Sequence, residues 1–184
     1  MNALRKSVAC LAAIAMLAGP GKGKDAMALR LTSSAFDAAG NIPTVHTCDG
    51  KDVSPPLLWY NIPEAAKSLV LIVDDPDAPD PAAPQRVWTH WVLYNIPPHS
   101  AGLPQGAKPQ NLPPGTREGL NDWKRTSYGG PCPPIGRHRY FHKLYALDIV
   151  LPDLGHPTKA ELENAMEGHV IEKAELIGRY QRSK

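Results

Sequence analysis

The sequence predicts a mainly β protein with helices confined to its C-terminal part. Three segments rich in apolar, β-branched and aromatic residues carry the strand signal, at residues 68–73, 88–96 and 138–147. Twenty prolines, about twice the usual share, are scattered between apolar runs and favour turns between short strands rather than disorder. The strand segments are spaced too irregularly for alternating βαβ units, which argues against a parallel α/β fold.

The first 28 residues are predicted to be a signal peptide. Arg5 and Lys6 form a short basic region, residues 8–18 form an apolar run, and Ala26-Met27-Ala28 offers a small-residue cleavage site. The apolar run is too short to span a bilayer, which takes about 20 residues. We therefore expect a periplasmic or secreted protein with no transmembrane segment after cleavage and a single domain over residues 29–184. The alternative is a disordered tail on a cytosolic protein.

The first part of this domain is expected to contain short extended pieces and one central strand. The short pieces are Leu29–Leu31, Val45–Thr47 and Leu57–Trp59. Residues 68–73 (Ser-Leu-Val-Leu-Ile-Val) form a continuous apolar run, which is typical of a strand buried on both faces. The strand is expected to end before residues 74–79, because the sequence Asp-Asp-Pro-Asp-Ala-Pro favours a turn.

The second and third strands carry aromatic and imidazole side chains near their starts. In residues 138–147, a period of two places His138 and Tyr140 on one face. The same period in residues 88–96 predicts two faces, one formed by Trp88, His90, Val92 and Tyr94 and the other by Thr89, Trp91 and Leu93.

Helical signals occur only near the C-terminus. Residues 158–161 (Thr-Lys-Ala-Glu) form a capping box before an apolar pattern at Leu162, Ala165 and Met166. Gly168 interrupts that pattern. A second short helix is expected at Val170–Ala174 and a final strand at Glu175–Tyr180.

Charge and cysteine content limit the partners and the chemistry. The formal net charge is +2 and the basic residues form no run, so nucleic acid is not an expected partner. Signal cleavage would remove Cys10 and leave Cys48 and Cys132, an even pair that an oxidising compartment favours as a disulfide. This bond would close a loop of about 84 residues, worth roughly 4–5 kcal/mol in the chain-entropy model. Two buried free thiols are the alternative.

Polar side chains gather at the ends of the three strand segments. If those ends converge, they line a small cleft, and the Gly-Gly-Pro-Cys-Pro-Pro loop at residues 129–134 forms its rim. The candidates are carboxylates, an indole, imidazoles and a phenol: Asp74, Asp75, Asp77, Trp88, His90, His138 and Tyr140.

Three kinds of chemistry are open to such a cleft. A metal site of His90, His138 and Asp75 is one, although His138 and His142 lie about 13 Å apart on a strand and would not share an ion. Hydrolysis is the second, but no serine sits in a Gly-x-Ser-x-Gly elbow. Recognition of a small anion such as phosphate is the third, because histidines, a tyrosine hydroxyl and loop amides can all donate hydrogen bonds. The only basic side chain noted near the cleft is Arg139, on the opposite strand face.

The ordered motifs resemble those of the phosphatidylethanolamine-binding proteins, in particular their bacterial Raf-kinase-inhibitor-like (YbhB/YbcL) branch. The matching motifs are Asp-Pro-Asp-Ala-Pro at 75–79, Trp-x-His-Trp at 88–91 and Gly-x-His-Arg-Tyr at 136–140. The resemblance covers roughly residues 30–182. It implies a large central β-sheet with a smaller second sheet and short C-terminal helices.

The resemblance also implies a function. Family members are generally not enzymes, and a small pocket accepts phosphate or a phospholipid head group such as phosphoethanolamine, with no cofactor or metal. The alternative is a protein-interaction module that inhibits a protease, hydrolase or kinase. Two departures are a loop of only three residues between Pro134 and His138, and Cys132 where the eukaryotic relatives have glycine. Carried over by motif, the ligand-binding residues are Asp75, Asp77, Pro79, Trp88, His90, Gly130, Pro133, His138 and Tyr140.

Overall fold

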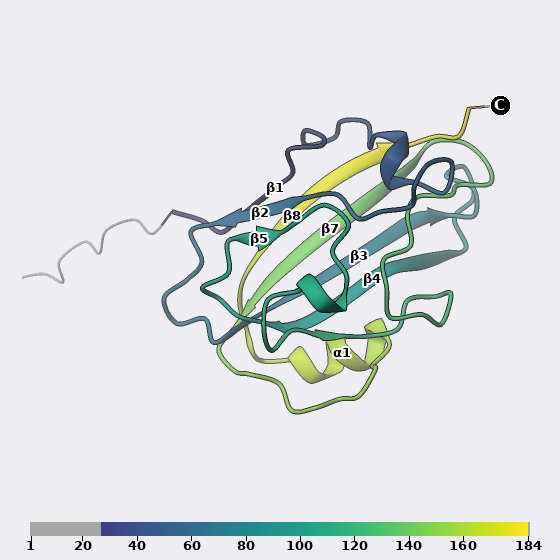
Figure 1. Cartoon of the computed structure of the whole chain (residues 1–184). Helices are drawn as coiled ribbons and strands as arrows, with labels where there is room; N and C mark the ends of the chain where they lie inside the picture. The colour runs from purple at the N-terminus through teal and green to yellow at the C-terminus, as the bar shows by residue number, and fades with distance from the viewer. Residues whose placement is uncertain (1–26, 184) are drawn as a thin grey trace, which may run out of the picture.

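A five-stranded antiparallel sheet crosses the molecule (Figure 1) in a computed structural model that describes residues 27–183. Its strand order is β6-β4-β3-β7-β8, so β3 is central, as its apolar run predicts. The mainly β class is confirmed. The strands are β3 (Ser68–Ala78), β4 (Arg86–Ile96), β6 (Arg117–Glu118), β7 (His138–Leu147) and β8 (Val170–Tyr180).

A smaller three-stranded sheet packs against one face of the large sheet. It consists of β1 (Arg30–Thr32), β2 (Leu57–Tyr60) and β5 (Gly102–Leu103) in the order β1-β2-β5, with antiparallel pairing. Its buried side chains, which include Leu31, Leu57 and Leu103, join a core cluster with Leu71 of β3 and Leu144 of β7. This larger core cluster lies on the side of the large sheet that also carries the polar cleft residues.

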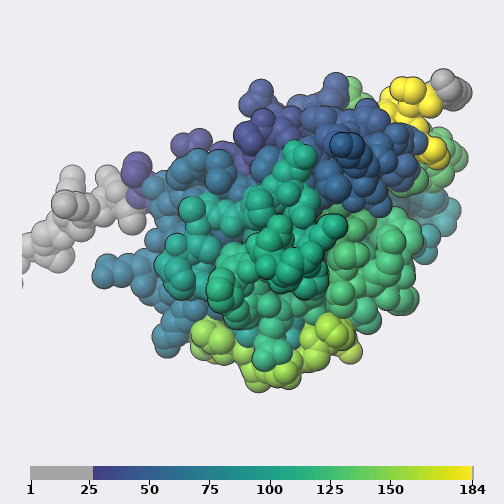
Figure 2. All heavy atoms as spheres, viewed as in Figure 1, coloured from purple at the N-terminus to yellow at the C-terminus, as the bar shows by residue number. Residues whose placement is uncertain are grey.

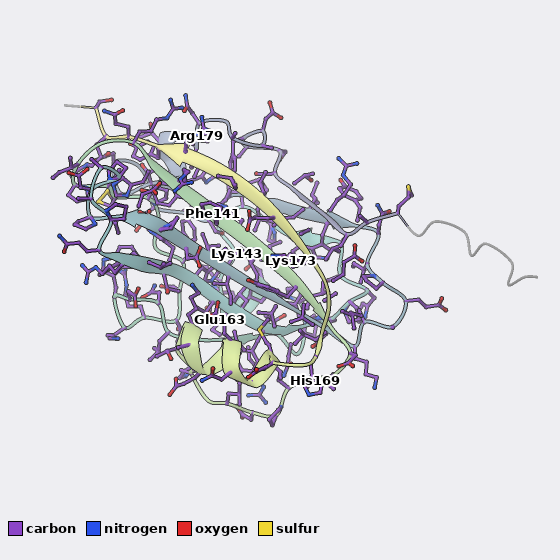
Figure 3. The ribbon with its side chains drawn as sticks, turned by 180° about the vertical axis from the view of Figure 1, so that it is seen from behind. Phe141, Lys143, Glu163, His169, Lys173 and Arg179 are labelled. Atoms are coloured by element: carbon purple, nitrogen blue, oxygen red, sulfur yellow. A yellow bond between two sulfur atoms is a disulfide. The ribbon has the colours of Figure 1, made fainter. Side chains whose placement is uncertain are left out.

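The opposite face of the large sheet is covered in part by a single helix, α1 (Lys159–Met166). Seen from behind (Figure 3), α1 crosses one part of this face, while Phe141, Lys143 and Lys173 lie over β7 and β8. Leu162 and Met166 of α1 pack in a second core cluster with Ile72 and other residues of the sheet. No helix among residues 27–183 is long and apolar enough to cross a membrane.

Strand β3 runs through the segment that was expected to be a turn. It continues to Ala78, and the prediction that it ends before Asp74 is wrong. Pairing with β4 and β7 holds the acidic segment extended, since Asp74 is opposite Thr89 and Phe141. Adjacent acids therefore point to opposite faces. Asp74, fully buried, binds Lys159 and Lys143 at 2.7 and 2.8 Å on the α1 side.

A β-bulge in β4 changes which side chains share a face. Val73 pairs with Trp91 but Asp74 pairs with Thr89, so His90 is an extra residue in β4. The predicted face of Trp88, His90, Val92 and Tyr94 is therefore wrong. Val92 and Tyr94 belong to the cluster under α1, and Trp91 belongs to the other cluster, next to which His90 and Trp88 line a cleft.

The C-terminal segment contains one helix rather than two. The predicted capping box is present at the start of α1, where Thr158 accepts a hydrogen bond from the Glu161 amide. The predicted helix at Val170–Ala174 is wrong, because these residues begin β8 and pair with β7. Gly168 has a φ of 79°, a left-handed conformation that glycine adopts without steric cost, and it lies in the turn between α1 and β8.

Two other predictions concern the N-terminal half. Residues 45–47 were expected to be extended, but a 3-10 helix occupies Thr44–His46, because the His46 and Thr47 amides donate back to the carbonyls of Pro43 and Thr44. The predicted signal peptide lies almost entirely outside the described residues.

A disulfide joins Cys48 to Cys132 and fastens the predicted rim loop to the segment after the 3-10 helix. This is the pairing that the sequence predicts. The Cys48 amide also donates to the Pro131 carbonyl (3.1 Å), and Tyr128 donates to the His46 carbonyl (2.9 Å). Figure 2 shows the dark-blue residues, which include the segment around the 3-10 helix, packed against the green residues that precede β7.

Removal of the disulfide is expected to destabilise the protein substantially. The bond spans a sequence separation of 84 residues, so its loss in the double variant Cys48→Ser/Cys132→Ser should lower the free energy of unfolding by about 4–5 kcal/mol. Denaturant unfolding of the oxidised wild type and the variant measures this difference. A loss below about 1 kcal/mol would contradict the assigned role.

Stability should depend on pH through His142. This residue of β7 is buried against Phe36, and burial lowers its pKa to about 4 from an ordinary value of 6.5. Between pH 6.5 and 4 the unfolded chain binds a proton that the folded state does not, so stability falls as pH decreases through this window. His142→Leu should remove about 2–3 kcal/mol of the loss between pH 7 and 4.5. The exposed His99→Leu is the matched control, and equal pH dependence in the two variants would refute the assignment.

Candidate functional site

A hollow of about 240 Å³ opens where the end of β3 meets the starts of β4 and β7. In Figure 1 this is the end of the large sheet nearest the C-terminus. Three separate chain segments and the Gly/Pro loop therefore converge, as the positions of the polar residues predict. The lining residues are Asp75, Ala78, Pro79, Arg86, Trp88, His90, Trp123, Cys132, Pro133, Pro134 and His138.

A buried hydrogen bond between β3 and β7 fixes the floor of the hollow. Asp75 Oδ2 lies 2.7 Å from His138 Nδ1, and the two residues are 3% and 0% exposed. His138 Nε2 lies 2.9 Å from the Ile135 carbonyl oxygen. Both ring nitrogens are thus engaged within the protein, and neither is free for a ligand.

His90 presents a different hydrogen-bonding pattern. Its Nδ1 lies 2.7 Å from the Gly129 carbonyl oxygen, so Nδ1 carries a proton. Its Nε2 is buried and has no hydrogen-bond partner among residues 27–183. Burial lowers the pKa of His90, which favours the neutral ring. A neutral His90 with its proton on Nδ1 offers an acceptor at Nε2.

Aromatic rings hold the walls of the hollow. The rings of Trp88 and His90 both pack edge-on against Trp123, with centroids 5.2 and 5.1 Å apart. The Arg86 guanidinium lies 4.3 Å from the centre of the Trp88 ring, in a cation–π arrangement. Arg86 therefore supplies a positive charge at the mouth, where no ion pair with a carboxylate is present among the described residues.

Two residues carried over from the family motifs, Tyr140 and Gly130, support the hollow without lining it. Tyr140 is buried next to the rings of His90 and His138, and burial raises its pKa. The Gly130 amide donates to Asp52 Oδ1 (2.7 Å), and a Cβ at Gly130 would collide with the His46 carbonyl oxygen. Tyr140 thus positions two imidazole rings that line the hollow, and Gly130 joins the rim loop to the segment around the 3-10 helix.

Asp77 is likewise outside the lining, because its carboxylate is occupied. The Arg139 amide, Nε and Nη2 all donate to it at 2.7–2.9 Å. These hydrogen bonds hold the pKa of Asp77 below its ordinary value. Arg139, noted from the sequence as the only nearby basic residue, is thus paired with Asp77.

Sequence reasoning missed Arg86 and Trp123 in the lining. Arg86 lies two residues before Trp88, so the period of two could have placed it on the same face. Trp123 sits in an irregular segment and gave no periodic signal. Together, the cation of Arg86, the indole donor of Trp88 and the acceptor of His90 suit a small ligand that combines negative charge with a donated proton.

Comparisons with known proteins agree with this architecture. The sequence profile described as "Phosphatidylethanolamine-binding protein" matches residues 32–181. A UPF0098 protein of Methanothermobacter thermautotrophicus is 50% identical over 155 residues, which cover 84% of this chain and 99% of that protein. A UPF0098 protein of Chlamydia pneumoniae is 43% identical and covers 84% and 100% of the two chains.

Two crystal structures share the fold. The phosphatidylethanolamine-binding protein homologue CT736 from Chlamydia trachomatis is 43% identical, with a TM-score of 0.78 over 85% of this chain and 99% of that one. YbcL of E. coli, a member of the mammalian PEBP family, is 31% identical with a TM-score of 0.76, over 84% and 99% of the two chains. The sheet order, the hollow and these matches lead to one conclusion: this chain belongs to the phosphatidylethanolamine-binding protein family.

Proposed function

We propose that this protein is a non-catalytic binding protein whose hollow takes a small phosphoryl anion, such as phosphate or a phosphoethanolamine head group. The observation that carries the proposal is the cation of Arg86, stacked on Trp88, beside two buried polar atoms of lining residues that lack partners within residues 27–183: Trp88 Nε1 and His90 Nε2. Buried polar groups are nearly always hydrogen-bonded, so such atoms beside a hollow favour an external partner. The volume, about 240 Å³, suits a head group rather than a drug-sized ligand, whose sites measure about 300–1,000 Å³.

The side chains favour binding over catalysis. Among the described lining residues there is no serine or threonine, and Cys132 is held in the disulfide. His138 has both ring nitrogens engaged, so it lacks a free position for general acid–base work. The same engagement argues against His138 as a metal ligand.

Arg86 should supply much of the affinity for a phosphoryl group. Titration with O-phosphoethanolamine, followed by fluorescence of Trp88 and Trp123, should give saturable binding to the wild type. Arg86→Gln should weaken it about 10- to 100-fold, because a charge-assisted hydrogen bond contributes about 1.5–3 kcal/mol. Arg30→Gln, an exposed residue of β1, is the control and should bind normally. No saturation up to millimolar ligand would count against the proposed function.

Asp77 should matter for stability and little for ligand binding. Asp77→Asn weakens the interaction of a buried carboxylate with the half-exposed Arg139, so we expect a loss of about 1–3 kcal/mol of unfolding free energy at pH 7. The wild-type contribution should be lost as pH falls below the ordinary pKa of Asp77, about 3.8, because the folded state holds the ionised form. Affinity for O-phosphoethanolamine should stay within about threefold of wild type; a loss as large as that of Arg86→Gln would place Asp77 in the binding site.

We also propose that the protein is exported. The basic, apolar and small-residue pattern of residues 1–28 supports this, and an exposed disulfide fits an oxidising compartment. Intact mass measurement of protein recovered from a periplasmic extract should show loss of the residues up to about Ala28. Full-length protein found only in the cytosol would refute export.

A further inference from the structure

His90 has one ring nitrogen engaged within the protein and one without a partner among residues 27–183. Its Nδ1 donates to the Gly129 carbonyl oxygen at 2.7 Å, and a carbonyl oxygen only accepts. The ring is 2% exposed, and Nε2 has no partner in the described part of the chain. Because Nδ1 is engaged, Nε2 is the nitrogen through which His90, a lining residue, can meet a ligand. In the neutral ring that nitrogen carries a lone pair, which repels an anionic oxygen.

The groups around His90 determine whether its Nε2 can be protonated, which would remove the repulsion between its lone pair and an anionic oxygen. Burial lowers its pKa, so the free ring is neutral near pH 7. Carboxylates on two sides act in the opposite direction, and a bound anion would add to their effect. The titratable and charged groups near the ring come from β3 (Asp75, and Asp74 on the opposite face), the segment before β7 (Asp122), β7 (His138, Tyr140, His142) and the hollow's mouth (Arg86).

His138 cannot donate a hydrogen bond to the phosphoryl oxygen in place of His90. Both of its ring nitrogens are bound within the protein, at 2.7 and 2.9 Å from their acceptors. The described lining residues therefore offer no free imidazole N–H before a ligand enters. A phosphoryl oxygen placed against His90 needs one additional proton.

We infer that this site binds a phosphate monoester together with one proton, shared between a phosphoryl oxygen and His90 Nε2. The inference rests on the proposed function and specifies the form of the ligand. A monoester loses its second proton with a pKa of about 6, so above pH 7 it is mostly a dianion. When the dianion binds to the protein with a neutral His90, the complex takes up one proton from the solvent. Affinity therefore falls about tenfold per pH unit above pH 7.

Calorimetry of the folded wild-type protein tests this. Methyl phosphate is the probe, because it has no ammonium group that could donate to His90. Titrations at pH 8 in two buffers of different ionisation enthalpy give the number of protons taken up per ligand, which should be close to one. In His90→Gln, whose amide does not titrate, uptake should fall to near zero. The exposed His99→Gln is the matched control and should keep the wild-type value.

Each outcome is decisive. Wild-type binding without proton uptake overturns the inference and leaves the proposed function intact. Absence of binding between pH 6 and 8 overturns both. Undiminished uptake in folded His90→Gln shows that the proton resides elsewhere, which also overturns the inference. If that variant does not fold, 15N NMR of the wild type replaces it: His90 Nε2 should change from an unprotonated to a protonated signal on saturation, and an unchanged signal refutes the assignment.

Discussion

The hydrogen bond between Asp75 and His138 is the interaction on which the hollow depends. It joins the two central strands β3 and β7 below the surface, at 2.7 Å between two side chains that are almost fully buried. Removal of either side chain would leave a buried polar atom of the other, Asp75 Oδ2 or His138 Nδ1, without this partner, which is costly. The bond also engages His138 within the protein, so neighbouring residues rather than His138 must contact a ligand. The chemistry of the site thus shifts from the paired residues at the floor to Arg86, Trp88 and His90 on β4.

The β-bulge in β4 brings His90 to the side of the sheet that carries the hollow. An unbroken period of two would group His90 with Val92 and Tyr94, which pack beneath α1. One extra residue in β4 instead places His90 beside Tyr140, with ring centroids 5.2 Å apart. The disulfide at Cys132 holds the rim loop of residues 129–134 in place, since this loop has little regular structure of its own. The β-bulge and the rim loop, which are irregular segments, therefore form the site at the end of a regular sheet.

Sequence patterns predicted the parts of this structure that depend on local order. The strand at 138–147 is regular, and its alternation put His138 and Tyr140 on one side correctly. The bulge at His90 could not be predicted, because it arises from the register between β3 and β4 rather than from any residue within β4. Residues 170–174 have a mixed composition, and pairing with β7 rather than propensity makes them a strand. Trp123 was missed because it lies in an irregular segment that has no periodic pattern, whereas the position of Arg86, two residues before Trp88, could have been predicted.

The central claim is that a phosphoryl group sits between Arg86 and His90 in the hollow. A crystal structure of the wild-type protein grown with O-phosphoethanolamine in phosphate-free solution tests it most directly. The account predicts phosphoryl density within hydrogen-bond distance of the Arg86 guanidinium and His90 Nε2, with the Asp75–His138 bond unchanged. Ligand density elsewhere on the molecule, with His90 Nε2 still unpartnered, would contradict it.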